Sequence, residues 1–366
     1  MTDFVASADI VKEPGIGESS TPYAITYAAN GDTWTILSGV TVASTNNAAI
    51  FSDFSNNRLT NHGTVNSGNN IGVQFRNGNN GVVSNATDAW IVGLQTGVWL
   101  GGTAGTTSNT LDNDGSVVGL RFYGVLFAFG GGGVFNNRGD TYGDEAGVQT
   151  SSSAPVTINN DGSIRSANLG VYASQSANVV ITVDNGAKGI IKAPTAIKSG
   201  GQGSVDLDNL GSIVGNIELT TAGADHVRNQ GTITGEARLG AGSDTFVFAG
   251  GKQGAVFGES GADHFEFATR LARKKDAGFV ADFTTGEDVI GVSRSLFKKI
   301  GKEGPLKAKF FTAGNKATDE DDHFIYSDKK DALFYDKDGK GGAGQVLVAK
   351  LPDGADVKAG DLVVIA

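Results

Sequence analysis

Short runs of alternating apolar and polar residues recur through the first 250 residues of the chain, and turn-forming residues separate them. Typical runs are Val156-Thr157-Ile158 and Val180-Ile181-Thr182-Val183, each of which leads into an asparagine. Alternation with a period of two is typical of half-buried strands, and helical periodicity is absent from this part of the sequence. We therefore expect it to consist of short β-strands.

These strands belong to a repeat that is marked by the phrase Asn-x-Gly-x-Val/Ile. Neighbouring copies begin 20 to 28 residues apart, and Gly-Val phrases such as Gly72-Val73 and Gly97-Val98 lie between them. Each repeat therefore holds about three short strands, which is typical of a solenoid whose coils stack on one another. The asparagines that mark the repeat are Asn61, Asn85, Asn113, Asn137, Asn160, Asn185, Asn209 and Asn229.

The period predicts an all-β chain that forms a right-handed parallel β-solenoid, or β-helix. We expect an N-terminal cap over residues 1–35, the solenoid over 36–268 and a small β-rich C-terminal domain over 269–366. The recurrent asparagine is interpreted as a turn residue, because asparagine tolerates left-handed backbone geometry and can bond to the next rung. The region resembles the parallel β-helices of bacterial surface and secreted proteins, and this resemblance specifies architecture, not activity.

The composition changes near residue 250. Residues 1–250 contain 11 Lys and Arg against 20 Asp and Glu, a net charge of −9, whereas residues 251–366 contain 18 against 19, a net charge of −1. The first part is also rich in glycine and asparagine, which oppose helix interiors. The change places the predicted domain boundary near Thr269–Lys275, where the repeat has ended.

The composition also disfavours several classes of protein. The chain has no cysteine, which excludes disulfides and Cys-based zinc sites. Its net charge of −10 argues against nucleic-acid binding, and no apolar run is long enough to span a membrane as a helix. The N-terminal Met1-Thr2-Asp3-Phe4 does not begin a signal peptide. We therefore expect a cytoplasmic protein or one that is exported by a signal elsewhere in the chain.

Three aspartates form a second pattern at the end of the repeat region. They occur in Gly223-Ala224-Asp225, Gly242-Ser243-Asp244 and Gly261-Ala262-Asp263, at two equal intervals of 19 residues. In stacked coils these carboxylates would lie about 4.8 Å apart and repel each other by ~3 kcal/mol at an effective dielectric of 20. Such a column needs solvation or a counter-cation, and oxygen ligands of this kind favour Ca²⁺. The simpler alternative is that the aspartates only terminate strands.

These loops resemble the Gly-Gly-x-Gly-x-Asp-x-apolar repeats of hemolysin-type, or RTX, secreted proteins. That family binds Ca²⁺ between successive turns, which implies about one to three sites here. The sequence departs from the family at Leu239 and Glu259, where the family has glycine, and only one edge of the coil carries the motif. The residues implied as metal-binding are Asp225, Gly240, Gly242, Asp244, Gly258, Gly261 and Asp263, with Asp282 and Asp288 as possible further ligands.

The C-terminal segment resembles the tail of the same family. Residues 322–339 contain two alternating strands followed by a Gly-rich turn, and the apolar run 362–366 ends the chain. In that family the uncleaved C-terminal region directs type I secretion, which implies an extracellular protein without an N-terminal signal. The resemblance also implies a calcium switch, in which the acidic column closes only at the higher calcium concentration outside the cell.

The sequence offers few candidates for catalysis, and we expect no catalytic site. The best candidates are acidic residues that flank the recurrent asparagine or lie near Tyr142, and we interpret them as turn and solvated-loop residues. A polysaccharide lyase or epimerase built on a β-helix is the alternative. The acidic residues concerned are Asp112, Asp114, Asp206, Asp208, Asp140, Asp144 and Glu145.

One outward-facing column is a candidate binding surface. If the valine of each Gly-Val phrase points inward, the next residue points outward, which places Trp99, Leu126 and Tyr172 in a row. Such a strip would bind a glycan, a cell-surface partner or a second copy of the chain, although single exposed apolar residues are also ordinary. The leading hypothesis is a secreted, calcium-binding solenoid with a structural, adhesive or matrix role.

Overall fold

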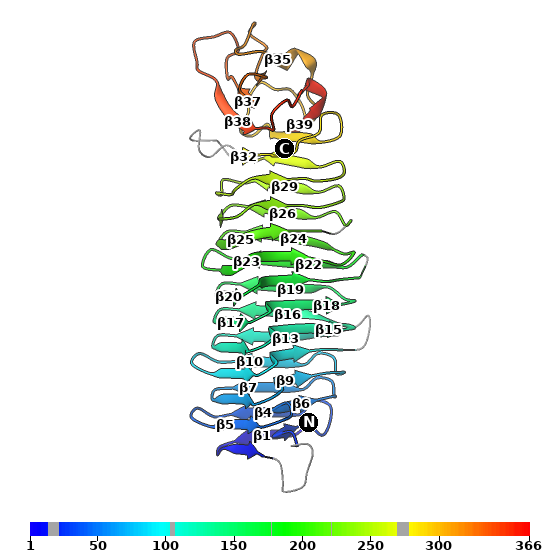
Figure 1. Cartoon of the computed structure of the whole chain (residues 1–366), viewed down its shortest axis with the longest axis vertical. Helices are drawn as coiled ribbons and strands as arrows, with labels where there is room; N and C mark the ends of the chain where they lie inside the picture. The colour runs from blue at the N-terminus through cyan, green and yellow to red at the C-terminus, as the bar shows by residue number, and fades with distance from the viewer. Residues whose placement is uncertain (14–21, 103–106, 177, 221, 269–277) are drawn as a thin grey trace. The chain divides into compact units, whose positions relative to one another are not determined.

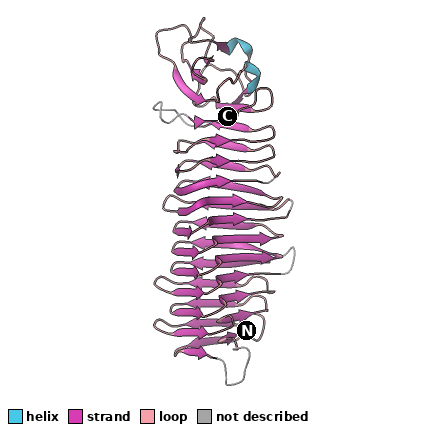
Figure 2. Ribbon diagram, viewed as in Figure 1, coloured by secondary structure: helices cyan, strands magenta, loops and turns pink. Residues whose placement is uncertain are grey.

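The computed structural model describes residues 1–13, 22–102, 107–176, 178–220, 222–268 and 278–366. The fold is all-β, with parallel strands stacked in the coils of a β-solenoid, as predicted (Figures 1 and 2). The chain divides into two compact units, which we describe separately. Unit 1 comprises residues 1–206 and 211–215, and unit 2 comprises residues 207–210 and 216–366.

Each coil of unit 1 contributes one strand to each of three faces, and every strand pairs in parallel with the equivalent strand of the next coil. The first face contains β1 (Asp3–Ala6), β4 (Thr33–Ile36), β7 (Arg58–Asn61), β10 (Val82–Asn85), β13 (Thr107–Asn113), β16 (Gly131–Asn137), β19 (Val156–Asn160) and β22 (Val180–Asn185). The second contains β2 (Ile10–Lys12), β5 (Thr41–Ser44), β8 (Thr64–Ser67), β11 (Trp90–Gly93), β14 (Ser116–Gly119), β17 (Asp140–Gly143) and β20 (Ser163–Ser166). The third contains β3 (Ile25–Thr26), β6 (Ile50–Ser52), β9 (Ile71–Phe75), β12 (Thr96–Leu100), β15 (Tyr123–Phe129), β18 (Ala146–Ser152) and β21 (Leu169–Ala173). The long strand β23 (Ile190–Ser199) pairs with both β20 and β21.

The apolar half of each alternating strand fills the interior of unit 1. On the first face Leu111, Phe135, Ile158 and Val183 follow one another in register, and all four are buried. The valines of the Gly-Val phrases form a second buried column on the third face, so the prediction that they point inward is confirmed. Burial of these branched side chains in continuous columns supplies the hydrophobic stabilisation of the coils.

The glycine of each Gly-Val phrase is required by close packing between coils. A Cβ on Gly97 would lie 2.7 Å from the carbonyl oxygen of Gly124, and a Cβ on Gly124 would lie 2.6 Å from that of Gly147. These distances are shorter than van der Waals contact with backbone atoms that cannot move away. The glycines therefore allow this corner of each coil to approach the next.

The recurrent asparagines of unit 1 form a buried column that we call the Asn ladder. The Nδ2 group of each member donates to the Oδ1 atom of the next, at 2.8 Å in every step. An amide both donates and accepts, so a column of amides satisfies its own hydrogen bonds away from water. The members are Asn61, Asn85, Asn113, Asn137, Asn160 and Asn185.

The predicted bond from each asparagine to the next rung is confirmed, but the predicted left-handed turn geometry is wrong. The ladder residues end strands, and none of them has a positive φ. Left-handed asparagines occur instead at Asn56, Asn80 and Asn178. The repeat therefore selects asparagine for its self-complementary amide and not for its backbone freedom.

Unit 2 contains further coils and a five-stranded sheet. Its coil strands stack in parallel in the order β26 (His226–Asn229), β29 (Thr245–Phe248), β31 (His264–Phe267), β33 (Val289–Ser293) and β39 (Leu362–Ile365), and β34 (Gly304–Pro305) pairs antiparallel with β39. Shorter coil strands are β27 (Thr232–Ile233), β28 (Ala237–Arg238) and β30 (Val256–Phe257), while β24 (Ser204–Asn209) and β25 (Ser212–Glu218) cross the division between the units.

The five-stranded sheet has the order β32 (Gly278–Phe279), β38 (Val346–Lys350), β37 (Ala332–Tyr335), β36 (Phe324–Ser327) and β35 (Phe311–Ala313). The described helices of this unit are the 3-10 turns η2 (Ala308–Phe310) and η3 (Ala359–Asp361), drawn in cyan in Figure 2.

The coil stack of unit 2 includes residues from the predicted C-terminal domain. Both β33 and β39 follow residue 268, and both join the same sheet as β31. The predicted boundary segment Thr269–Lys275 lies outside the described residues. The division at 268/269 therefore stays a prediction.

Candidate functional site

The predicted aspartate column exists in unit 2, and it has four members. The strands that follow Asp225, Asp244 and Asp263 pair in register, which stacks the three aspartates at the same position of successive coils. Asp288 precedes β33 in the same way and continues the column. We call Asp225, Asp244, Asp263 and Asp288 the Asp ladder. All four are at least 96% buried, so their carboxylates are held away from water.

The carboxylates of Asp244, Asp263 and Asp288 each accept a hydrogen bond from the backbone of the preceding rung. The N–H of Asp225 donates to Asp244 Oδ1 at 2.7 Å, and the N–H of Asp244 donates to Asp263 Oδ1 at 2.9 Å. Asp288 accepts from the N–H of Asp263 at 3.0 Å and from the N–H of Thr284 at 2.7 Å. These aspartates therefore lie directly before each strand and link its coil to the next, a structural role at a strand end like the one in the simpler of the two interpretations.

Burial gives the ladder unusual electrostatics. Desolvation raises the pKa of both Asp244 and Asp263 to about 7, and the neighbouring carboxylates add to this effect, while the backbone hydrogen bonds oppose it. Burial also raises the pKa of Asp288 above its ordinary value. The Oδ2 atom of Asp244 is buried without a hydrogen-bond partner among the described residues. A proton or a cation at this atom would relieve the unfavourable burial of charge.

The other residues that were implied as calcium ligands lie in the loops before these aspartates. Gly240 has a φ of 100° and Gly261 a φ of 125°, and a Cβ on Gly261 would lie 1.6 Å from the carbonyl oxygen of Gly242. A Cβ on Gly258 would lie 2.1 Å from Asp263 Oδ2. The glycines are thus required by the backbone conformation and by close packing, whatever binds there.

Asp282 lies beside this region and has both carboxylate oxygens engaged. They accept the N–H groups of Gly258 and Glu259, each at 2.9 Å. The side chain therefore fixes the loop that leads to Asp263. Like the carboxylates of the Asp ladder, the Asp282 carboxylate accepts hydrogen bonds from backbone N–H groups. A bound cation would instead need oxygen atoms arranged around it as ligands.

The described arrangement is not a complete calcium site. Ca²⁺ takes six to eight oxygen ligands, whereas Asp244 Oδ2 is the ladder oxygen that is fully buried without a hydrogen-bond partner among the described residues. Among the described residues, no three or more His, Asp and Glu side chains are grouped so that they could hold a metal ion. The residues as placed do not fit the ion, and calcium binding stays a prediction that would require these loops to rearrange.

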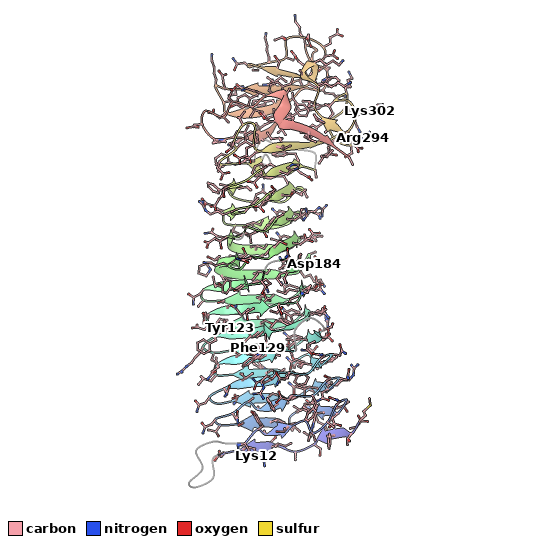
Figure 3. All side chains as sticks on the ribbon, turned by 90° about the vertical axis from the view of Figure 1, so that its right-hand side faces the viewer. Lys12, Tyr123, Phe129, Asp184, Arg294 and Lys302 are labelled. Atoms are coloured by element: carbon pink, nitrogen blue, oxygen red, sulfur yellow. The ribbon has the colours of Figure 1, made fainter. Side chains whose placement is uncertain are left out.

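The predicted outward column on the third face is in register but only partly exposed. Trp99 stands opposite Leu126, which is followed by Gln149 and Tyr172 on the next two coils. Trp99, Leu126 and Tyr172 are half-buried, and the Trp99 ring stacks on Phe129 with ring centroids 5.6 Å apart. Phe129 itself is 61% exposed and has a φ of 60°, which is rare for an aromatic residue. Phe129 ends β15, which begins at Tyr123, and Figure 3 labels both residues.

A more exposed apolar surface, which the sequence interpretation missed, lies on the second face and the following corner. Trp90 is 47% exposed, Leu120 is 50% exposed and Phe122 is 42% exposed. Val92 pairs with Val118 between them, and the N–H of Leu120 donates to the Gly93 carbonyl, so these residues occupy two adjacent coils. We call Trp90, Val92, Val118, Leu120 and Phe122 the Trp90 patch. The signal was hidden because the turn after Asn85 is two residues longer than the turn after Asn113, which obscures the equivalence of Trp90 and Ser116.

The acidic residues near the Asn ladder are engaged by neighbouring side chains. Asp112 accepts from Asn136 Nδ2 at 2.8 Å, and Asp114 accepts from Arg138 Nη2 at 3.0 Å. Asp208 Oδ2 lies 3.5 Å from Arg228 Nη1. These pairings are typical of ladders between coils, and each of the three carboxylates, which we interpreted as turn residues, contacts a side chain of a neighbouring coil.

The acidic cluster near Tyr142 contains two separate contacts. Asp140 forms an ion pair with Arg165, whose Nε atom donates to Asp140 Oδ1 at 3.0 Å. The Tyr142 hydroxyl donates to Asp144 Oδ1 at 3.0 Å, and burial together with this bond raises the pKa of Tyr142. A phenol with a raised pKa is a poorer general base at neutral pH.

Comparisons of the chain with protein-family models, with curated proteins and with solved structures found no match. Within the described part of the chain, no helix has the length and apolar character needed to cross a membrane.

Proposed function

We propose that the protein is an extracellular β-solenoid scaffold that attaches to a partner surface through the Trp90 patch and carries no catalytic site. The observation that supports this proposal most directly is the exposure of Trp90, Leu120 and Phe122 on adjacent coils. Clustered exposed apolar side chains are costly in a soluble protein and mark interaction surfaces. Aromatic rings on a rigid sheet also bury large areas on binding with little loss of side-chain entropy.

The scaffold role is supported by the way the coils are held together. The Asn ladder connects the coils of unit 1 from Asn61 to Asn185, and the buried apolar columns run beside it. Side chains on the faces are therefore fixed at the spacing of the coils. A rigid row of this kind suits an adhesive or matrix protein, which must present a surface and resist unfolding.

The extracellular setting and export by type I secretion belong to this proposal and depend on the RTX resemblance of the loops and the C-terminal tail. Calcium binding near the Asp ladder is its third component. The unpartnered Asp244 Oδ2 supports it, because a buried carboxylate oxygen favours a cation when it is ionised. Closure of these coils after export would then depend on calcium.

A polysaccharide lyase or epimerase is the alternative function, and the group around Tyr142 and Arg165 is its best candidate site. Tyr142 and Arg165 occupy adjacent coils in register. However, Arg165 is neutralised by Asp140, and the pKa of Tyr142 is raised. The scaffold role is therefore the better supported of the two.

The adhesive role can be tested with the triple variant Trp90→Ser, Leu120→Ser, Phe122→Ser. We expect at least about a tenfold loss of binding to immobilised polysaccharide or of self-association, because a few buried aromatic anchors dominate most interfaces. Surface plasmon resonance and sedimentation velocity would measure the two readouts. Val5→Ser, Val11→Ser, Val180→Ser is the matched control, since these valines are also exposed but lie apart from the patch. Equal binding by the patch variant and the unmodified protein would contradict the proposal.

A further inference from the structure

Unit 2 carries a concentrated positive charge in a chain whose net charge is −10. Residues 294–309 contain six Lys and Arg and one acidic residue, Glu303. Figure 3 shows Arg294 and Lys302 at the same edge of this unit. Such a concentration creates a local positive potential that opposes the sign of the whole chain. The six cationic residues are Arg294, Lys298, Lys299, Lys302, Lys307 and Lys309.

Part of this charge remains unpaired. Glu303 Oε1 lies 3.2 Å from Arg294 Nε, and Asp321 lies 3.1 Å from Lys309 Nζ. Among the described residues, no carboxylate lies within ion-pair distance of Lys298, Lys299 or Lys302. The cluster therefore retains a net positive charge after its internal ion pairs are counted.

The cluster surrounds a pocket of about 490 Å³. Arg294, Lys298 and Lys299 are exposed at its wall, and Ser295 adds a hydroxyl group. Phe297 and Ile300 are buried side chains that also line it. Ala366, the last residue of the sequence, also lines the pocket, and its main-chain oxygen accepts a hydrogen bond from the Ser293 hydroxyl at 2.6 Å. A pocket of this size holds a small organic ligand, and it is much larger than a single inorganic anion needs.

The backbone of the pocket is held in an unusual conformation. Lys299 has a φ of 65°, a value that glycine and asparagine adopt more readily than lysine. Lys298 is fixed next to it, because its N–H donates to Tyr335 Oη at 2.9 Å and its carbonyl accepts from the same hydroxyl at 2.8 Å. A charged residue whose backbone is held in a rarely populated conformation, as Lys299 is here, is typical of a functional site.

We propose that this pocket binds an acidic sugar, a uronate or a sulfated residue, at one position along a polysaccharide. The guanidinium of Arg294 and the ammonium groups of Lys298 and Lys299 match a carboxylate or sulfate, and the Ser295 hydroxyl matches a ring hydroxyl. The apolar lining from Phe297 and Ile300 accommodates the sugar ring. This site is separate from the Trp90 patch and does not depend on its adhesive role.

The test compares acidic and neutral oligosaccharides by isothermal titration calorimetry on the full chain. The probes are an oligogalacturonate, a sulfated heparin-derived oligosaccharide and a maltooligosaccharide of similar length. The test variant is Arg294→Ala, Lys298→Ala, Lys299→Asn, because asparagine tolerates the left-handed backbone at residue 299. The charge-matched control is Lys188→Ala, Lys192→Ala, Lys350→Ala, which removes three exposed cations elsewhere.

We expect at least one acidic oligosaccharide to bind, the maltooligosaccharide to bind weakly or not at all, and the pocket variant to lose about tenfold in affinity. The control should stay within about twofold of the unmodified protein, and its binding should keep the same salt dependence. Equal losses in the pocket variant and the control would overturn the proposal, as would failure of every acidic probe to bind.

Two further measurements separate sugar binding from binding to anionic membranes and from loss of folding. Anionic phosphatidylserine vesicles test the other source of negative charge, and binding to vesicles without binding to the acidic oligosaccharides would overturn the proposal. If the triple variant melts early, the single variant Lys298→Ala removes one exposed ammonium and should still weaken binding by about threefold. An unchanged affinity in that variant would count against the site.

Discussion

Two columns of side chains run through the coils, and they differ by one atom per residue. The Asn ladder of unit 1 joins amide to amide at 2.8 Å, so each side chain is both donor and acceptor. The Asp ladder of unit 2 lies at the other end of the strands, immediately before each of them, and consists of carboxylates, which can only accept; their donors are backbone N–H groups. One ladder is neutral at every pH, whereas the other gains charge when it loses protons.

The difference shows that the two ends of the coil strands carry buried ladders with two different purposes. A buried column of amides adds specificity and stability without sensitivity to the solution. A buried column of carboxylates makes the stability of its coils depend on protons or cations, because repulsion and desolvation grow as the carboxylates ionise. Exchange of single residues between the two chemistries tests this comparison.

The largest effect is expected from Asn113→Asp in the middle of the Asn ladder. The new carboxylate would keep the acceptor for Asn85 but lose the donor to Asn137 Oδ1 and to the Asp140 carbonyl. We expect the free energy of unfolding of unit 1 to fall by about 3–5 kcal/mol at pH 8 and by less at pH 4, where the carboxyl can donate. Thermal melts and hydrogen exchange would measure it. The control Asn66→Asp makes the same change on an exposed outward position, and an equal loss there would refute the role of the ladder.

The pH dependence of unit 2 should have the opposite sign to that of an ordinary salt-bridged carboxylate. The pKa of Asp244 and of Asp263 is about 7 in the folded protein and near 4 when unfolded. Their contribution to stability is therefore fully present below pH 4 and is lost as the pH rises through 7, a change of a few kcal/mol. Hydrogen exchange of β29 and β31 between pH 5 and pH 8 would reveal it. A flat profile across that range would show that these carboxylates are solvated.

Asp244→Asn should remove part of this dependence. The amide oxygen still accepts the N–H of Asp225, while the charge at the unpartnered Oδ2 position disappears. We expect the variant to be more stable than the unmodified protein at pH 8 without calcium, by roughly 1–3 kcal/mol, and equal to it near pH 4. The matched control is Asp353→Asn, which neutralises an exposed aspartate. If both variants shift the melting temperature equally, net charge and not the ladder explains the result.

The smallest effect is expected from calcium. A site with a Kd near 10⁻⁴ M at millimolar Ca²⁺ would contribute ~1.4 kcal/mol, and more at pH 8 than at pH 5 because the ligands must be ionised. Melting curves with Ca²⁺, with Mg²⁺ and with EGTA would measure it, and Asp244→Asn should abolish the shift. Identical curves with Ca²⁺ and with EGTA would remove calcium from the proposed function.

Much of the architecture could be predicted from the sequence, because the same pattern of apolar, polar and turn residues recurs in successive coils. The period of the asparagines and the Gly-Val phrases gave the parallel coils and about three strands per coil, and the 19-residue interval gave the alignment of Asp225, Asp244 and Asp263. The addition of Asp288 was less visible, since 25 residues separate it from Asp263.

The surfaces were harder to predict. Exposure depends on what lies beside a residue, and Trp99 proved half-buried because Phe129, thirty residues later, stacks on its ring. The Trp90 patch combines residues of two coils whose alignment depends on turn length, and the basic pocket brings Ala366 beside residues 294–301. A turn that gains two residues changes which side chains become neighbours without changing the repeat itself.

The sequence by itself determined which residues point inward, since alternation and repeat period follow from the geometry of a single strand. Only the tertiary structure decided how the polar groups inside are satisfied. It showed that the asparagines bond to one another and that the aspartates receive backbone N–H groups, because these partners come from neighbouring coils about twenty residues away. The free energy of a buried polar group depends on such partners, and a residue's own place in the repeat does not reveal them.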